Sequence, residues 1–341
     1  REDISEFIHD LKGDNRYIMD YLIVEVLRIQ PKEIQEFLVK TSILEQFSAP
    51  LCNTVLGIND SHKIIETLEK NNMFIIPLDN QRQWYRYHHL FRQLLQHQLV
   101  QVYSGEAIDA LHLRACDWLE SAGFIEDAVI HALKGGDSER AAIVVENHLH
   151  GPINQEDWRL TDRWINLLPE EARQRPGLLA AQALLEQLRY RLGLILPLLE
   201  KAEKGLAETK YGYTLEQEKA WRGVINTFRA TVFIPSITPE EALQNAEKAL
   251  QQVDPSAQYV YSQANLWRIY ALQQKGDAQE ALRLSRNLLA SRIGPPDVFT
   301  NRMMLAQCAV YYGEADARGL HICGSNYLDL ALRSGQQISI A

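Results

Sequence analysis

Apolar residues recur at helical spacing through most of the chain, and this period is interrupted near residues 73–87 by an apolar run and an alternation of aromatic residues. Pro31 suits the first turn of one predicted helix, and Gly57 suits the end of another. Asp60 or Ser61 can cap a third. Before the change of period, the pattern predicts helices over residues 14–29, 31–39, 50–56 and 60–71.

This segment has the composition of a β-hairpin. A strand over residues 73–78 is followed by the turn-forming pair Asp79 and Asn80 and by a return strand over 83–87. A further helix begins near His88. Three helices, a hairpin and a final helix are the order of elements in a winged helix, so the sequence predicts that domain here.

The third helix of a winged helix is usually the one that enters the DNA major groove, so its charge is a test of DNA binding. A helix that contacts DNA needs donors for phosphates and base edges. We therefore expect no direct DNA contact through this helix, because its charged residues are net acidic: Asp60, Lys63, Glu66, Glu69 and Lys70.

Beyond about residue 105 the pattern predicts amphipathic helices and no strand. A Gly-x4-Ala motif recurs at Gly123, Gly136 and Gly276, with Asp137 and Asp277 directly after the last two glycines. In this motif the glycine forms the turn, the aspartate caps the next helix, and the alanine lets that helix approach its neighbour. Helical hairpins of this kind predict degenerate, tetratricopeptide-like repeats.

The predicted fold class is therefore mainly α, a winged helix with a small β-hairpin followed by a tetratricopeptide-like α-superhelix. Residues 1–30 are expected to be a helical remnant of a nucleotide-binding region. Residues 31–103 are expected to form the winged helix, and residues 104–341 the helical repeats.

The composition is that of a globular protein that builds a substantial core, with 46% hydrophobic residues. A formal net charge of −9 opposes nonspecific attraction to nucleic acid or anionic lipid. No apolar run is long enough to span a membrane. The chain begins without Met inside a predicted helix, so we expect a segment of a longer protein.

Cysteine usage favours a reducing, cytoplasmic setting. The four cysteines are widely spaced and form no Cys-x-x-Cys pair, which predicts neither a zinc cluster nor a dense disulfide framework: Cys52, Cys116, Cys308 and Cys323. His148 and His150 are two positions apart on a predicted helix, where side chains do not face each other, so we interpret them as surface histidines.

The familiar signatures of nucleotide-binding and hydrolytic enzymes are missing, including Gly-x4-Gly-Lys-Ser/Thr and His-Glu-x-x-His. We expect the chain itself not to be an enzyme and to hold no cofactor. The acidic pairs at 170–171 and 240–241 each follow a proline, where they complement a helix dipole. Aromatic residues of the repeats could line a groove or fill gaps between helices, and we favour packing: Trp158, Trp164, Tyr190, Trp221, Tyr259, Tyr261, Trp267 and Tyr270.

The segment most like a site is the joint between the return strand and the next helix, where His88 and His89 stand together. A helix N-terminus has unpaired N–H groups and the positive end of the helix dipole, so imidazole donors there suit an anion such as a phosphate. The alternative interpretation is a plain core pattern, since aromatic alternation precedes Leu90, Leu94 and Leu95 at helical spacing.

Several stretches resemble the LuxR-type large ATP-binding transcription regulators, the group that includes the maltose regulator MalT. These are signal-transducing ATPases with numerous domains. The similarity is specific over roughly residues 13–175 and diffuse beyond. The residues that carry it lie at 13–22, 37–44, 77–79 and 84–91, with a weaker stretch at 164–170.

The resemblance implies an order of parts: a nucleotide-binding core, a helical segment, a winged helix, a repeat superhelix, and a C-terminal helix-turn-helix. The present chain would supply the middle parts, without the phosphate loop or the helix-turn-helix. In related switch ATPases a Met-His-Asp motif of the winged helix contacts a phosphate of bound ADP. His88 matches the motif histidine, while Tyr87 and His89 depart from Met and Asp.

Two functions remain open. The first is a regulatory and sensing segment of an ATP-dependent transcription activator, partnered by the nucleotide-binding domain of its own parent chain. Its repeats would receive a small-molecule inducer or a regulatory protein, and the parent would bind ATP or ADP through His88 and the phosphate loop. The alternative is a helical scaffold that binds a protein or peptide and has no role in transcription.

Overall fold

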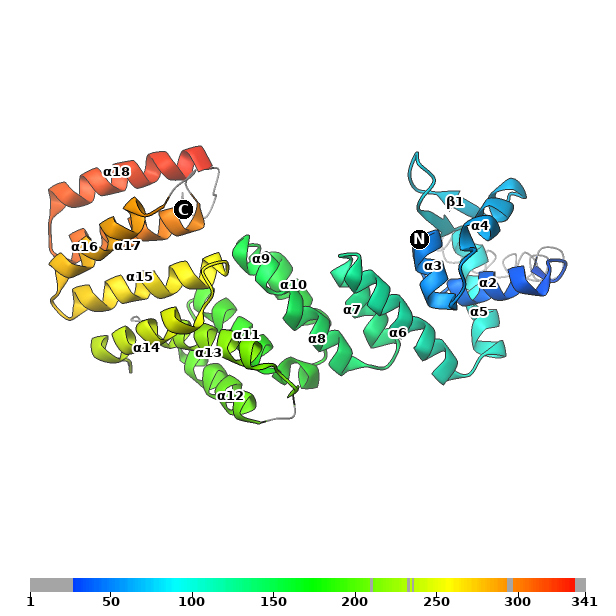
Figure 1. Cartoon of the computed structure of the whole chain (residues 1–341), viewed down its shortest axis with the longest axis horizontal. Coiled ribbons are helices and arrows are strands. Elements are labelled where there is room, and N and C mark those ends of the chain that lie inside the picture. Colours follow the sequence, from blue (N-terminus) through cyan, green and yellow to red (C-terminus); the bar gives the residue numbers. More distant parts are fainter. Residues whose placement is uncertain (1–26, 209–210, 232–233, 235, 293–296, 335–341) are drawn as a thin grey trace, which may run out of the picture. The chain divides into compact units, whose positions relative to one another are not determined.

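The computed structural model describes residues 27–208, 211–231, 234, 236–292 and 297–334. The predicted helix over 14–29 lies almost wholly outside these residues. The chain divides into two compact units, which meet in the sequence at Val144 and Val145. The predicted fold class, a winged helix with a small hairpin and a series of helices, is confirmed (Figure 1).

The first unit contains the predicted winged helix and a helical extension. Helix α2 begins one residue after Pro31, which occupies the N-cap position. Gly57 ends α3 in the left-handed conformation, as predicted, with φ +70°. The elements are α2 (Lys32–Thr41), α3 (Ala49–Leu56), α4 (Ser61–Lys70), β1 (Ile75–Pro77), β2 (Tyr85–Tyr87), α5 (His89–Val102), α6 (Gly105–Ser121), α7 (Ile125–Lys134) and α8 (Ser138–His148), the last crossing into the second unit.

Strands β1 and β2 pair antiparallel, with Ile75 opposite Tyr87 and Pro77 opposite Tyr85. Both strands are shorter than predicted. The Asp79 carboxylate accepts hydrogen bonds from the backbone N–H groups of Gln83 and Trp84, at 3.2 and 2.7 Å, so these two residues belong to the turn instead of the strand. The turn itself is therefore built by Asp79, as the sequence predicts.

Helix α4 is capped by a residue that the sequence did not indicate. Asp60 lies at the N-cap position, but its side chain makes no capping hydrogen bond. The Asn53 side chain on α3 accepts instead from the Ser61 N–H, at 3.1 Å. The cap therefore also fixes the α3 to α4 connection, and the prediction that Asp60 or Ser61 would supply it is wrong.

The Gly-x4-Ala motifs form helical turns as predicted. Gly123, Gly136 and Gly276 all have positive φ, between 74° and 96°, a conformation that side-chain-bearing residues rarely adopt. Asp137 caps α8 by accepting from the Arg140 N–H at 2.7 Å. Asp277 makes no such bond, and its carboxylate lies 3.9 Å from the Lys275 ammonium. The prediction that these aspartates cap the next helix is therefore confirmed for Asp137 and wrong for Asp277.

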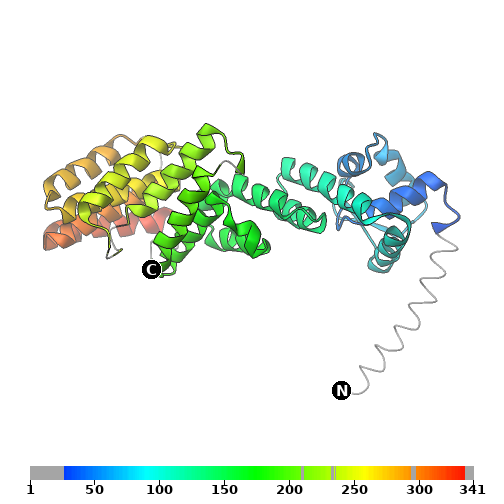
Figure 2. The same ribbon diagram turned by 90° about the horizontal axis from the view of Figure 1, so that it is seen from below.

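The second unit is a stack of helices, and no strand occurs among its described residues. Pro176 and Pro239 begin α11 and α14 at their first turns. Figures 1 and 2 show successive helices from α11 onward lying side by side. The elements are α9 (His150–Asn154), α10 (Trp158–Leu167), η2 (Glu170–Gln174), α11 (Pro176–Leu188), η3 (Leu192–Leu194), α12 (Ile195–Ala207), α13 (Leu215–Arg229), α14 (Pro239–Gln252), α15 (Gln258–Gln274), α16 (Ala278–Ala290), α17 (Val298–Gly313) and α18 (Ala317–Ser334).

None of the helices within the described ranges is both long and apolar enough to cross a membrane. Of the predicted acidic caps, Glu241 forms a full capping box with Thr238 at the start of α14. Glu170 and Glu171 lie in the first turn of η2, after Pro169 at its N-cap.

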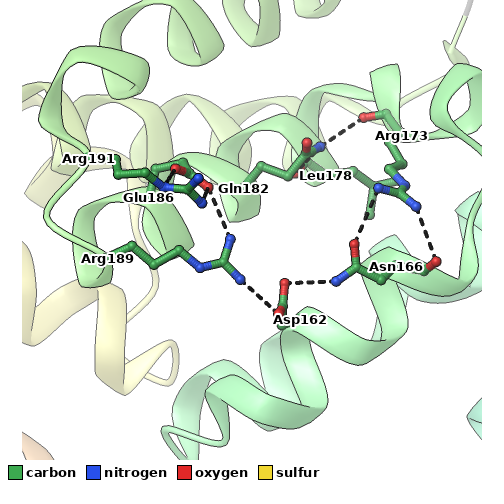
Figure 3. A network of polar contacts seen from close by, with 8 residues as sticks. All are labelled: Asp162, Asn166, Arg173, Leu178, Gln182, Glu186, Arg189 and Arg191. Atoms are coloured by element: carbon green, nitrogen blue, oxygen red, sulfur yellow. Dashed lines mark hydrogen bonds and ion pairs between the residues drawn. The ribbon is translucent and has the colours of Figure 1, made fainter.

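A polar seam joins α10 to α11 (Figure 3). Asp162 on α10 pairs with the Arg189 guanidinium at 2.7 Å, and Arg189 also reaches Glu186 on α11 at 3.1 Å. At the other end of the seam the Arg173 guanidinium donates to the Asn166 side chain, and Asp162 accepts from Asn166 at 3.0 Å. The seam is continuous along the two helices, so it fixes their relative rotation.

A second set of contacts connects helices that are far apart in the sequence. The Arg302 guanidinium on α17 pairs with Glu156 at 2.5 Å and lies over the Tyr259 ring of α15. Asn154 donates to the Ser256 carbonyl and accepts from the Tyr259 N–H, each at 3.2 Å. The second unit is therefore held by long-range contacts as well as by neighbouring helices.

The most buried ion pair of the second unit joins Glu146 to Arg175, with Oε2 and Nε 2.7 Å apart and both side chains at most 5% exposed. The other oxygen, Oε1, accepts from the Gly177 N–H at 2.8 Å and from the Tyr213 hydroxyl at 2.6 Å. A Cβ at Gly177 would collide with Trp221 and with the Glu146 carboxylate. One carboxylate thus connects α8, the start of α11 and the segment before α13.

We expect Glu146→Gln to destabilise the protein by about 3–5 kcal/mol, because it leaves the buried Arg175 guanidinium without its carboxylate. The measurement is urea denaturation followed by circular dichroism. Arg283→Gln is the matched control, since it breaks an ion pair whose two side chains are 70% and 46% exposed and should leave the midpoint unchanged. Equal midpoints for the two variants would contradict the role given to Glu146.

Candidate functional site

The joint between β2 and α5 has the geometry that the sequence predicts. His88 is the N-cap residue of α5, with extended backbone angles of φ −58° and ψ 137°. Its N–H donates to the Phe74 carbonyl at 2.8 Å, and its carbonyl accepts from the Arg92 N–H at 2.9 Å. Both backbone groups are therefore used by the fold, while the imidazole makes no capping hydrogen bond.

The imidazoles at this joint are accessible. His88 is half-buried and His89 is exposed, and their ring centroids are 4.7 Å apart. The first N–H groups of a helix have no partner within the helix, so those of α5 lie at the same place as the two rings. Imidazole and backbone donors of this kind can hold an anionic oxygen. The location of the joint is confirmed, and the phosphate role of His88 stays a prediction.

The strand before the joint is anchored in the core. The Tyr87 side chain is buried, and its hydroxyl lies 2.6 Å from the Thr41 hydroxyl on α2. Burial raises the pKa of Tyr87 well above its usual value, so the phenol stays neutral. The Phe47 ring packs against it with centroids 4.6 Å apart. The core interpretation therefore holds for Tyr87, while the next residue faces a more open environment.

Helix α5 is also tied to the end of α2. The Arg92 guanidinium and the Gln96 amide both donate to the Ser42 carbonyl, at 3.2 and 3.1 Å. Arg92 lies 3.6 Å from the Glu45 carboxylate as well. These contacts hold the first two turns of α5, so the joint is placed by a fixed helix and a fixed strand.

Two cations of the wing and α4, Arg82 and Lys70, are paired with acids. Glu69 on α4 binds the Arg82 guanidinium of the wing at 2.9 Å and accepts from the Tyr85 hydroxyl at 3.3 Å. Lys70 pairs with Glu66 at 3.6 Å. An element that binds DNA must offer its cations to phosphates. Here the carboxylates of Glu66 and Glu69 already pair with Lys70 and Arg82.

An open cleft of about 1050 Å³ lies beside this face of the first unit. Trp84 of the hairpin packs edge-on against Trp118 of α6 and Phe124, with centroids 6.1 and 5.2 Å away. The Arg114 guanidinium of α6 donates to the Val55 carbonyl of α3 at 2.7 Å. Helix α6 is therefore packed on the winged-helix elements, whereas the predicted domain boundary at residues 103 and 104 stays a prediction.

A buried histidine pair was not indicated by the sequence. His112 on α6 and His131 on α7 place their Nδ1 atoms 3.0 Å apart, with the side chains 8% and 5% exposed. This contact requires one ring to donate and the other to accept. Burial lowers the pKa of His112 to about 4, and burial together with His112 lowers the pKa of His131 to about 3. Each histidine lies on the buried face of its own helix. Its position among the apolar residues of that face is the one local signal from which the pair could have been predicted.

We expect acid to destabilise the first unit through this pair. In the unfolded chain histidine takes up a proton near pH 6.5, whereas the folded pair stays neutral until about pH 4. The stabilising contribution is therefore complete above pH 7 and is lost as the pH falls through 6.5 toward 4. Between pH 7.5 and 5 the melting temperature should fall about 8–16 °C further than in the double variant His112→Leu/His131→Leu.

His97→Gln is the control for this measurement, because His97 is exposed on α5 and its loss should leave the pH dependence unchanged. Differential scanning calorimetry across the pH series provides the melting temperatures. An identical acid slope in the wild-type chain and the double variant would contradict the assignment.

The other candidate residues of the repeats are structural. His150 is exposed and stacks on Trp221 with centroids 5.5 Å apart, and His148 is half-buried. In the part of the chain that the structure describes, no three His, Cys, Asp or Glu side chains are grouped to hold a metal ion. The packing interpretation is confirmed for the buried aromatic residues of the repeats, Trp164, Trp221, Tyr259 and Trp267. Tyr190 differs, since it is 88% exposed.

Comparison with known proteins supports the resemblance to MalT-type regulators. Residues 23–107 match the family model of the MalT winged helix domain. The HTH-type transcriptional regulator MalT of Vibrio cholerae is 32% identical over 254 residues, and that of Vibrio campbellii is 29% identical over 256 residues. These alignments cover 74% and 75% of this chain and 27% of each relative. The chain thus spans about a quarter of the length of these curated relatives.

A solved structure shares the fold. It is a signal transduction ATPase with numerous domains (STAND) protein with a tetratricopeptide repeat sensor, from Pyrococcus horikoshii. The TM-score is 0.59 at 16% identity, over 94% of this chain and 47% of the archaeal chain. The resemblance to MalT-type regulators predicted from the sequence is confirmed by these matches.

Proposed function

We propose that this chain, whose residues 23–107 match the family model of the MalT winged helix domain, is the regulatory segment of an ATP-dependent transcription activator. The winged helix would couple a nucleotide switch in the parent chain to an effector-binding region in the helical repeats. The observation that carries the proposal is the accessible histidine joint at the start of α5, inside the domain that matches the MalT family.

His88 is the residue we assign to the nucleotide. The donors at the joint suit a phosphate, because two imidazoles and the first N–H groups of α5 lie together and no hydrophobic layer seals them. A single contact of this kind contributes roughly 0.3–2 kcal/mol, which biases a two-state equilibrium but does not bind a nucleotide alone. The phosphate loop of the parent chain would supply most of the affinity for ATP or ADP.

The helical repeats are proposed to receive the signal. Their helices are fixed by the α10 to α11 seam and by the Arg302 contacts, so an effector would meet a preformed surface. That effector would be a small-molecule inducer or a regulatory protein, and the segment itself would carry out no chemical reaction. We place the parent protein in the cytoplasm, where its target DNA lies.

The His88 assignment predicts a constitutive variant. In the full-length parent, His88→Ala should raise basal reporter transcription several-fold, because it removes a contact that favours the inactive, ADP-bound state. His97→Ala, two turns along the exposed side of the same helix, is the matched control and should leave basal transcription unchanged. The present chain alone should show no ADP binding by titration calorimetry.

Either of two results would count against this role: tight ADP binding by the present chain, or an unchanged basal level in the His88 variant. Immunoblotting of the parent and both variants checks that protein abundance is equal.

The paired cations of the wing and α4 predict no DNA binding by this chain. A gel shift with mixed-sequence duplex DNA should show no complex at protein concentrations up to about 10 µM in low salt. The variant Glu66→Lys releases Lys70 from its partner and adds a cation to α4, so it serves as the positive comparison. A salt-dependent shift with the wild-type chain would assign DNA contact to the winged helix instead.

A further inference from the structure

Helices α17 and α18 bring together two cysteines that are separated in the sequence by the turn between them. The Sγ atoms of Cys308 and Cys323 are 3.1 Å apart, in sulfur hydrogen-bond contact. The two helices run side by side in Figure 1. Cysteine spacing alone does not reveal the pair, because the hairpin that joins the two helices sets the distance between them.

The two thiols have different environments. Cys308 is half-buried, so a small reagent can reach it, while Cys323 is 6% exposed. One hydrogen bond joins the two sulfur atoms, and it lowers the pKa of Cys308 and raises that of Cys323. Cys308 is therefore the better nucleophile, and Cys323 remains a protonated thiol beside it.

The remaining cysteines provide an internal comparison. Cys52 and Cys116 are completely buried, and neither belongs to a cysteine pair. Burial raises the pKa of both thiols, that of Cys116 to about 11. Buried, protonated thiols of this kind are unreactive. Reactivity toward oxidants should therefore be concentrated at one place in the chain.

We propose that Cys308 and Cys323 are an oxidation site that forms a reversible intramolecular disulfide with a hydroperoxide as the oxidant. The Cys308 thiolate attacks the peroxide oxygen, the O–O bond breaks, and the departing alkoxide or hydroxide takes up a proton, which leaves a sulfenic acid on Cys308. The Cys323 sulfur then attacks the Cys308 sulfur. The S–S bond forms, the S–O bond breaks, and water leaves with the Cys323 proton.

Both electrons lost by the two thiols go to the peroxide, and a cellular dithiol or glutathione returns them when the disulfide is reduced. The sulfur atoms need to approach by about 1 Å to reach the length of an S–S bond. The product links α18 covalently to α17, which itself packs on α15. Oxidation would therefore fix the position of α18 on the helical stack.

The test is peptide mapping of the whole chain after treatment of the reduced, folded protein with hydrogen peroxide. Trypsin cuts after Arg302, Arg318 and Arg333, so the two cysteines fall in different peptides, 303–318 and 319–333. We expect these peptides to be linked, two hydrogens lighter than their sum, and to separate on reduction. Under native conditions Cys308 should also be alkylated by iodoacetamide at least about tenfold faster than Cys52 and Cys116.

Serine variants separate the two roles. Cys323→Ser should stop the reaction at the Cys308 sulfenic acid, which dimedone traps, and Cys308→Ser should abolish both products. Cys52→Ser is the matched control and should leave the linked peptides unchanged. Circular dichroism verifies that each variant is folded. The proposal is overturned if peroxide links no peptides, oxidises all four cysteines at one rate, or produces only links between chains.

Discussion

The second unit depends on one buried carboxylate. Glu146 lies among groups that each require it: the Arg175 guanidinium, the Gly177 N–H and the Tyr213 hydroxyl. A charge removed from water is tolerated only when such partners surround it, so the three segments that provide them must meet in one arrangement. Gly177 belongs to the same constraint, because no larger residue fits between Trp221 and the carboxylate.

The first unit depends instead on apolar and hydroxyl contacts around the hairpin. Phe47 packs on Tyr87 and pairs with Tyr85 through backbone hydrogen bonds, which adds a third segment to the two-stranded sheet. Trp84 extends the contact surface to Trp118 and Phe124. A hairpin of three-residue strands is weak alone, and these contacts make it a fixed support for the start of α5.

Much of this architecture is local and could be predicted from the sequence. The hairpin, the Asp79 turn, the glycine turns and the position of His88 all follow from residues close together in the chain. The failures concern partners chosen by packing. Asn53, which lies on the preceding helix, caps α4 in place of Asp60. No local pattern indicates which of several acceptable partners tertiary structure will bring nearer.

The same limit explains the pairs that sequence reasoning missed: Glu146 with Arg175, His112 with His131, and Cys308 with Cys323. His112 and His131, like Cys308 and Cys323, lie on successive helices, whereas α9, α10 and η2 separate Glu146 from Arg175 in the sequence. To predict these pairs one must know how far each helix is rotated about its axis. The apolar stripe of a helix defines this rotation only to within the width of a side chain.

The hydroxyl contact between Tyr87 and Thr41 has a consequence for the joint at the start of α5. Successive side chains of a strand face opposite sides, so a slip of β2 by one residue against β1 would bring Tyr87 to the surface and turn its histidine neighbour toward the interior. The register in which β2 pairs with β1 therefore determines whether the His88 imidazole is accessible. Any event that loosened this tyrosine would also change the exposure of His88.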